Sequence, residues 1–263
     1  MGKGGAGIQK EPIDEWIERM EKEPEEVAKE TKERIIKTLE LKTPDRIPIG
    51  GIGGDILATF TGITWYDLSY ELTEKTINAL VKFGHDYPQD FAFILAPYGL
   101  EGFIFAAAFA DYPEFSNIIR FHMGPIHDIM KDKWTRWPGR ELPPNIHPQF
   151  PGGVFMYPNE YKQFIEDPIG FIHNVVFPRA APGLGKPGTP QWNGAWTKIG
   201  WELHRIFAWQ LDLINRLQKL GYVFFPLTNA YTPTDFINDF LRHPTETMLD
   251  MRRPVSYTHL RAH

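Results

Sequence analysis

Small and polar residues that could bind a ligand follow three apolar segments, each of which we predict to be a β-strand. Glycines after the first segment allow backbone to approach a ligand closely. Carboxylate, hydroxyl and amide groups after the three segments offer hydrogen bonds to a polar ligand. The candidate substrate-binding residues are Gly53, Asp55, Tyr98, Thr228, Asn229 and Tyr231. The alternative interpretation is a helix cap for Asp55 and ordinary loop packing for the others; no residue is assigned a catalytic role.

His122, His127 and Asp128 are of residue types that can bind a metal ion. The Gly-Pro pair between the two histidines prevents the spacing that would place both on one helix face. We therefore interpret them as surface or loop residues and predict no metal site in this chain.

The predicted strands are Arg46 to Ile49, Phe91 to Leu95 and Tyr222 to Pro226. Helical patterns lie between them, and this alternation is typical of βα units with parallel strands. Residues 133–137 and 154–157 are predicted to form an inserted β-hairpin, and residues 180–194, rich in proline and glycine, a loop.

Two helices can be located from their apolar spacing. Residues 11–41 read as helix with a possible break at Pro24, and their apolar stripe includes Ile35, Ile36 and Leu39. A long helix is predicted from Ala195 to Leu220, and Gly221 supplies the stop.

The composition excludes several functions. The formal net charge is −5 and basic residues are not clustered, so no nucleic-acid partner is expected. The chain has no cysteine, which excludes disulfides and thiolate metal sites within it. No stretch approaches the ~20 apolar residues of a membrane span, and nothing resembles a signal peptide. We therefore expect a cytoplasmic protein, without a membrane partner, whose residues 1–10 are disordered.

Two segments carry a resemblance to a known family. Lys32 to Ile35, followed by Pro44 to Ile49, resembles the opening of the uroporphyrinogen decarboxylase superfamily; Asp239 to Arg242, followed by Thr247 to Met251, resembles a later segment. Trp137 to Gly139, with Pro144-Asn145 and Gln149-Phe150, is similar to one uncharacterised branch. The resemblance implies an α/β fold, a (β/α)8 barrel with an N-terminal helical extension and an inserted β-hairpin, and a site at the carboxyl ends of its strands. Asp250 is expected to cap or pair structurally.

Departures from the family pattern bear on the reaction. The family's decarboxylases have an arginine pair after the first strand and an aspartate after the second, whereas this chain has Gly50 to Asp55 and Ala96 to Tyr98. Without these groups, a substrate with eight carboxylates has no evident receiver. The resemblance therefore favours the superfamily's methyltransferases, which exchange methyl groups with a corrinoid, here carried by a partner protein. Porphyrinogen decarboxylation, an inactive fragment and a small-molecule binding module are the alternatives.

The end of the chain differs from the rest. Val255 to His263 matches a translated frame of a common transposon sequencing adaptor. We therefore expect residues 11–254 to be the N-terminal part of one truncated barrel domain and 255–263 to be a non-native tail. In the methyltransferase branch zinc is bound by a histidine and two cysteines of later strands, which would lie beyond Pro254. No cofactor is expected within this fragment; zinc and a corrinoid are expected for the full-length protein.

Overall fold

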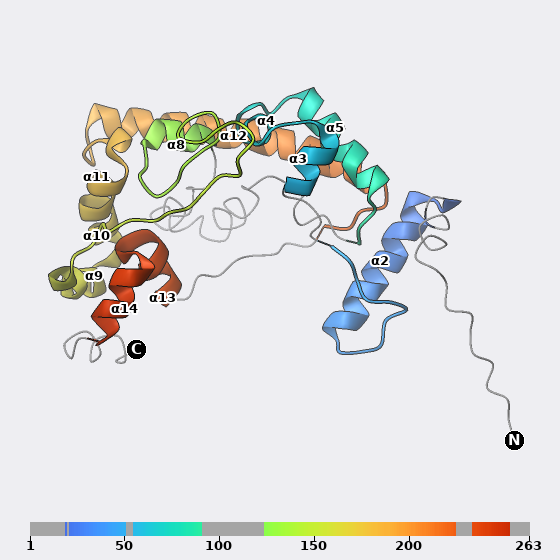
Figure 1. Cartoon of the computed structure of the whole chain (residues 1–263), viewed down its shortest axis with the longest axis horizontal. Coiled ribbons are helices and arrows are strands. Elements are labelled where there is room, and N and C mark those ends of the chain that lie inside the picture. Colours follow the sequence, from blue (N-terminus) through green and yellow to red (C-terminus); the bar gives the residue numbers. More distant parts are fainter. Residues whose placement is uncertain (1–18, 20, 51–54, 91–123, 225–232, 253–263) are drawn as a thin grey trace, which may run out of the picture.

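Helices dominate the part of the chain that the computed structural model describes, residues 19, 21–50, 55–90, 124–224 and 233–252 (Figure 1). The α-helices are α2 (Pro24–Leu39), α3 (Asp55–Thr61), α4 (Trp65–Tyr70), α5 (Glu74–Asp86), α8 (Gly124–Met130), α9 (Tyr161–Glu166), α10 (Pro168–Phe171), α11 (Phe177–Ala180), α12 (Pro190–Gln218), α13 (Pro233–Phe236) and α14 (Pro244–Arg252). Short 3₁₀ helices are η1 (Pro158–Glu160) and η3 (Pro182–Leu184), and π-helical turns are η2 (Ile172–Val176) and η4 (Ile237–Arg242).

The prediction of a (β/α)8 barrel is wrong for the described residues, which contain no β-strand. Where the first strand was expected, Ile47 is 81% exposed and Ile49 is 52% exposed. The backbone groups of Ile49 bond to Asp90 rather than to a strand: its N–H donates to Oδ2 at 2.7 Å, and its carbonyl accepts from the Asp90 N–H at 2.7 Å. The second predicted strand, Phe91 to Leu95, lies outside the described residues, as do the last two residues of the third.

The prediction of an inserted β-hairpin between residues 133–137 and 154–157 is also wrong. Arg136 forms an antiparallel β-bridge with Gln149, not with residues 154–157. The N–H groups of Phe155 and Met156 both donate to the carbonyl of Leu241, at 2.7 and 2.8 Å. Since those donors are already satisfied by the end of η4, residues 154–157 cannot pair as a strand through them.

Helix α12 is the longest helix, and its 29 residues span about 44 Å. It begins at Pro190, earlier than predicted, because Thr189 accepts a hydrogen bond from the N–H of Trp192 and caps the helix. It ends at Gln218, two residues before the predicted end at Leu220, and Gly221 follows with a φ of 81°. A Cβ there would lie 2.8 Å from that of Val27, so the glycine also allows α2 to pack closely.

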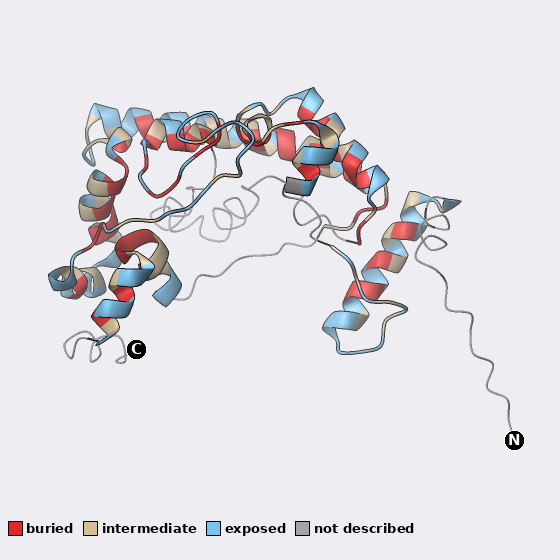
Figure 2. Cartoon of the chain, in the orientation of Figure 1, coloured by how far each residue is buried: buried red, intermediate tan, exposed pale blue. Residues whose placement is uncertain are grey.

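Buried side chains recur along α12 and join two apolar cores (Figure 2). Ile199 and Ile206 belong to one core, with Trp134 and Phe177. Leu213, in the second half of α12, belongs to the other core, which includes residues of α3, α4 and α5. The long helix therefore holds the N-terminal helices α3–α5 and the C-terminal helical region on one support.

The buried face of α2 differs from the predicted stripe. Ile35 is buried, but Ile36 and Leu39 are exposed. The face consists instead of Val27, Thr31, Arg34 and Ile35, which have helical spacing but include a hydroxyl and a guanidinium group. Part of this face is polar because Arg34 binds the carboxylates of Asp45 and Asp90. The predicted disorder of residues 1–10 and the predicted non-native tail 255–263 concern residues outside the described part.

Candidate functional site

A pocket of about 670 Å³ lies beside the carboxyl end of α3, and we call it the α3 pocket. Its volume is within the range of small-molecule sites. The polar and aromatic residues that line it are Thr59, Thr64, Trp65, Asn145, His147 and Gln149. They carry hydroxyl, amide, imidazole and indole groups, and none is a carboxylate or a permanent cation. Such a lining suits a neutral molecule with an aromatic or apolar part.

Local sequence fixes the helical wall of the α3 pocket. The chain turns after α3 at Gly62, whose φ of 69° favours glycine. Thr64 and Asp67 then form a capping box: the Asp67 N–H donates to Thr64 Oγ1 at 3.0 Å, and the Thr64 N–H donates to Asp67 Oδ2 at 2.7 Å. This cap starts α4 at Trp65, whose ring contacts that of His147 edge-on at 4.3 Å.

The opposite wall is the pocket loop, residues 137–149. The Tyr66 N–H donates to the carbonyl of Pro144 at 3.0 Å, which ties the loop to α4. Gln149 is held by two backbone hydrogen bonds with Arg136, at 2.8 and 2.9 Å. A Cβ on Gly139 would lie 2.4 Å from the Tyr66 ring, so the close approach requires glycine. Both walls of the pocket therefore have fixed backbones.

A buried histidine supports the pocket loop. His127, on α8, is 7% exposed; its Nδ1 lies 2.6 Å from Asp132 Oδ2 and its Nε2 lies 3.2 Å from Glu141 Oε1. Burial opposes its protonation, but the hydrogen bonds to Asp132 and Glu141 prevail, so the pKa of His127 is raised. Thr135 lies 3.2 Å from the same Nδ1 and accepts a bond from the Trp137 indole at 2.8 Å.

His127→Gln should make stability less dependent on pH. Because the folded pKa is raised, the charged interaction stabilises the protein fully below the unfolded pKa, about 6.5, and is lost as pH rises through the folded value. Below that pH the substitution should lower the free energy of unfolding by about 2 kcal/mol, as for a charged hydrogen bond. The free energy of unfolding, measured with urea at several pH values across this range, tests the prediction. His204→Gln, at an exposed residue of α12, is the control; parallel pH profiles for wild type and His127→Gln would contradict the assignment.

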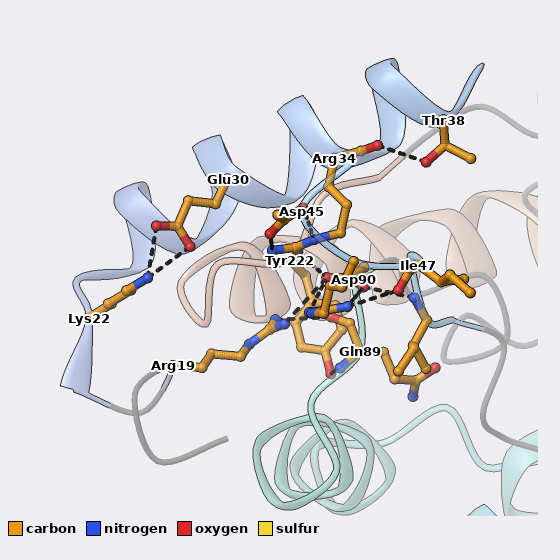
Figure 3. A network of polar contacts seen from close by, with 12 residues as sticks. Arg19, Lys22, Glu30, Arg34, Thr38, Asp45, Ile47, Gln89, Asp90 and Tyr222 are labelled. Carbon is orange, nitrogen blue, oxygen red and sulfur yellow. Dashed lines mark hydrogen bonds and ion pairs between the residues drawn. The ribbon is translucent and has the colours of Figure 1, made fainter. Parts of the chain in front are cut away.

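Two ion-pair clusters, each around a buried aspartate, involve the segments that carry the family resemblance. In the Asp90 cluster (Arg19, Arg34, Asp45, Arg46 and Asp90) the Asp90 side chain is fully buried (Figure 3). Arg34 Nη1 donates to its Oδ1 at 2.7 Å, Arg46 Nη1 donates to its Oδ2 at 2.6 Å, and Arg19 Nη1 lies 3.8 Å from Oδ1. Arg34 also binds both oxygens of Asp45, at 2.9 and 2.5 Å.

Burial by itself would raise the pKa of Asp90, but the hydrogen bonds from Arg46 and the Ile49 N–H hold this pKa below its usual range. Burial is the main cause that lowers the pKa of Arg19, and repulsion by Arg46 and Arg34 adds to it. The cluster is thus ionised and contains more cations than carboxylates.

Tyr222 connects the Asp90 cluster to the end of α12. Its hydroxyl donates to the Gly84 carbonyl at 2.8 Å and accepts from the Gln89 N–H at 3.1 Å. The three segments predicted as strands therefore come close together, although the described residues form no sheet. Asp90, just before the second segment, bonds to Ile49 of the first, and its neighbour Gln89 bonds to Tyr222 of the third.

In the second cluster, Arg242 and Asp250 are both 1% exposed, and Arg242 Nε donates to Asp250 Oδ2 at 2.7 Å. Arg242 Nη1 donates to the Met156 carbonyl at 2.7 Å, and the Tyr161 hydroxyl donates to Asp250 at 3.1 Å. Burial, followed by the charge of Asp250, raises the pKa of Tyr161 to about 12. The expectation that Asp250 pairs structurally is confirmed.

The structure describes one of the six candidate residues. Asp55 is the first residue of α3, in agreement with its expected place at the start of a short helix. The other five lie outside the described residues; they are Gly53, Tyr98, Thr228, Asn229 and Tyr231.

The interpretation of His127 as a surface or loop residue is wrong. His127 is buried within α8 rather than exposed, and Asp128 pairs with Arg140 at 2.7 Å. His122 lies outside the described residues. Within the described ranges, no three His, Cys, Asp or Glu side chains are placed to hold a metal ion.

The pocket residues Asn145, His147 and Gln149 were not candidates from sequence, although Asn145 and Gln149 belong to the segment similar to one family branch. Their grouping with Trp65 depends on a contact between distant parts of the chain. No family model matches this chain, and comparisons with curated proteins and with solved structures find no match either. Among the described helices, none is long and apolar enough to cross a membrane.

Proposed function

We propose that this chain binds a small, neutral, partly aromatic molecule in the α3 pocket and takes part in moving a methyl group between that molecule and a corrinoid on a partner protein in the cytoplasm. The observation that carries the proposal is the uncharged polar and aromatic lining of the pocket. The resemblance to the uroporphyrinogen decarboxylase superfamily supports the type of reaction.

Residues of both family-like segments take part in ion pairs with a buried carboxylate. Asp45 and Arg46 of the first family-like segment belong to the Asp90 cluster, and Arg242 and Asp250 of the second form the other buried pair. Polar residues that must be paired when buried are costly to replace singly.

The lining also favours methyl transfer over porphyrinogen decarboxylation. A substrate with many carboxylates requires several cationic groups. The side chains identified in the α3 pocket include no such group, and the arginines of the Asp90 cluster are already engaged by Asp90 and Asp45.

Zinc does not fit the residues present. The sequence contains no cysteine, and the described part of the chain has no cluster of potential metal ligands. We therefore assign no step to zinc. The role of this chain in the proposed reaction is to bind and orient the small molecule, through the amides of Asn145 and Gln149 and the ring of Trp65.

Methyl transfer can be followed with methylcobalamin as donor and benzyl mercaptan, a neutral aromatic thiol, as acceptor. The cobalt–carbon bond breaks and its electron pair stays on cobalt, which is reduced from Co(III) to Co(I). The sulfur forms the new bond to the methyl carbon, and the thiol proton goes to solvent. The change in visible absorbance of the corrinoid reports the rate above the protein-free reaction.

Asn145→Ala and Gln149→Ala should each lower kcat/KM for the thiol by about tenfold, the upper range for loss of a neutral hydrogen bond. Both residues are exposed, so folding should be little affected. Asn193→Ala, at an exposed residue of α12, is the matched control. Turnover that neither pocket variant alters would contradict the site. Thiol binding without turnover would favour the binding module, and conversion of uroporphyrinogen to coproporphyrinogen would favour the decarboxylase.

A further inference from the structure

His127 lies beside the pocket loop and meets a carboxylate at each of its ring nitrogens. Nδ1 lies 2.6 Å from Oδ2 of Asp132, and Nε2 lies 3.2 Å from Oε1 of Glu141, which belongs to the pocket loop. We infer that doubly protonated His127 is a positioning residue that holds this loop in its ligand-binding form, so that the α3 pocket binds its ligand tightly when His127 is charged and weakly when it is neutral. The inference rests on the proposed function, because it concerns the regulation of the same pocket.

Both contacts of the ring require a proton on each nitrogen. An ionised carboxylate can only accept hydrogen bonds, so each ring nitrogen must donate. Asp132 is an acceptor here, since its Oδ1 also accepts from the N–H groups of Trp134 and Thr135, at 3.0 and 2.9 Å. Burial by itself would raise the pKa of Glu141, but hydrogen bonds from two backbone N–H groups and from His127 hold this pKa below its usual range. A neutral imidazole has a single N–H and can satisfy only one of the two carboxylates.

The bond to Glu141 is the one that deprotonation removes. The Asp132 side chain is 1% exposed, whereas the Glu141 side chain is 45% exposed. The remaining N–H therefore stays with Asp132, because a buried carboxylate without a donor costs more than one that water can reach. The lone pair of Nε2 then faces Oε1 of Glu141, and their repulsion favours movement of Glu141 into solvent.

Glu141 ties the start of the pocket loop to α8. Its Oε2 accepts from the N–H of Trp137 at 3.0 Å, while its Oε1 faces His127. The carbonyl of Trp137 accepts from the N–H groups of Arg140 and Leu142, both at 3.1 Å, which closes the turn at the start of the loop. Release of Glu141 therefore loosens the turn that leads to the amide side chains of the α3 pocket.

The other ionisable groups around α8 do not replace this interaction. Asp128, next to His127 on α8, pairs with Arg140 of the pocket loop at 2.7 Å. The hydroxyl of Tyr70, on α4, lies 3.4 Å from Asp128; burial, followed by the charge of Asp128, raises the pKa of Tyr70, so this group stays neutral. Helices α12 and η3 also pack against α8, and within the described part of the chain they form no ion pair or hydrogen bond with His127. The pair between Asp128 and Arg140 persists when His127 is neutral, so we expect weaker binding rather than loss of the loop structure.

Binding of benzyl alcohol to the whole chain, followed by NMR from about pH 6 to about pH 9, tests the inference. Benzyl alcohol is a neutral aromatic probe that does not ionise in this range. We expect its affinity to fall by about tenfold as pH rises, as for loss of one hydrogen bond to a charged group. The fall should occur over the pH range in which the ring nitrogens of His127 titrate. Because binding and protonation are linked, a saturating concentration of the probe should in turn raise the pKa of His127.

Glu141→Gln should bind the probe with an affinity that does not change over this pH range, because an amide can accept from the charged ring or donate to the neutral one. His127→Gln should likewise lose the pH dependence. His204→Gln, at an exposed residue of α12, is the control and should keep the wild-type dependence. The variants also separate His127 from His147, which lines the pocket itself. A pH dependence that persists in Glu141→Gln or in His127→Gln would overturn the inference.

Failure of the inference can be distinguished from failure of the proposed function. If wild type binds benzyl alcohol equally well at both ends of the pH range, the inference is overturned and the proposed function stands. If benzyl alcohol binds at no pH, the proposed function fails and the inference fails with it. Hydrogen exchange of the free protein adds a readout that needs no ligand: protection of the Tyr66 N–H, which donates to the carbonyl of Pro144, should fall over the same pH range after correction for intrinsic exchange. Unchanged protection would overturn the inference.

Discussion

Asp90→Asn is expected to lower the free energy of unfolding by about 3–5 kcal/mol, the usual cost of removing one partner from a buried ion pair. Asp90 is fully buried and pairs with Arg34, Arg46 and Arg19. The substitution removes the carboxylate that these three guanidinium groups share. Urea unfolding followed by circular dichroism at neutral pH measures the loss.

Asp86→Asn is the matched control for this prediction. Asp86 is near Asp90 in the sequence but has an exposed side chain that pairs with Lys82 and His85. Exposed pairs contribute little to stability, so this variant should unfold at nearly the wild-type urea concentration. Equal midpoints for Asp90→Asn and wild type would show that the Asp90 cluster does not hold α2 to the rest of the protein.

The Asp90 cluster also makes the stability of the protein depend on pH in acidic solution. The pKa of Asp90 is lowered in the folded state, so its contribution is present above the unfolded pKa, about 3.9, and is lost as pH falls through the folded value. The difference in stability between wild type and Asp90→Asn should therefore shrink in strongly acidic solution.

Arg242→Met and Asp250→Asn should each lower the free energy of unfolding by about 3–5 kcal/mol. Each variant removes one member of a buried ion pair, because Arg242 and Asp250 pair at 2.7 Å with both side chains almost fully buried. Met retains much of the length of the arginine stem, so its effect reports mainly the lost charge and the lost bond to the Met156 carbonyl.

A double-mutant cycle separates this pairing from a general effect of disruption. The double variant should cost at least about 1 kcal/mol less than the sum of the two single losses, because directly contacting residues are coupled. Glu246→Gln is the control: Glu246 lies 3.3 Å from Arg242, but its side chain is half-exposed, so little change is expected. Additive losses in the cycle would contradict a direct Arg242–Asp250 interaction.

Local sequence signals predicted the elements that local interactions determine. Gly221 was predicted to follow the end of α12, and the helix ends three residues before it at Gln218; its start was predicted at Ala195, although Thr189 and Pro190 are favourable residues for starting a helix and α12 begins at Pro190. The start of α2 at Pro24 agrees with the possible break considered there, because proline is favoured in the first turn.

The errors arose where distant residues decide the structure. Arg46 to Ile49 has the composition of a strand, yet the backbone of Ile49 is satisfied by Asp90, 41 positions later. The predicted stripe of α2 failed because Thr31 and Arg34 occupy its buried face, and Arg34 is stabilised there by Asp90, 56 positions later. Sequence spacing contains no signal for such contacts.

For the candidate site too, the sequence predicted the local element but not the long-range contacts. The helix that begins at Asp55 was located by its local pattern, whereas the α3 pocket requires Trp65 and His147 to meet across more than one element. The segment that contains Asn145 and Gln149 was noted for its resemblance alone, and its place in a pocket follows from the support that His127 and Tyr66 give to the pocket loop.

The proposed methyl transfer is tested most directly by NMR with methylcobalamin carrying a ¹³C-labelled methyl group. The account predicts that, with this protein present, the label moves to the sulfur of benzyl mercaptan faster than in the protein-free mixture. It also predicts that Gln149→Ala slows the transfer by about tenfold. A label that stays on cobalt, or that moves no faster than without protein, would contradict it.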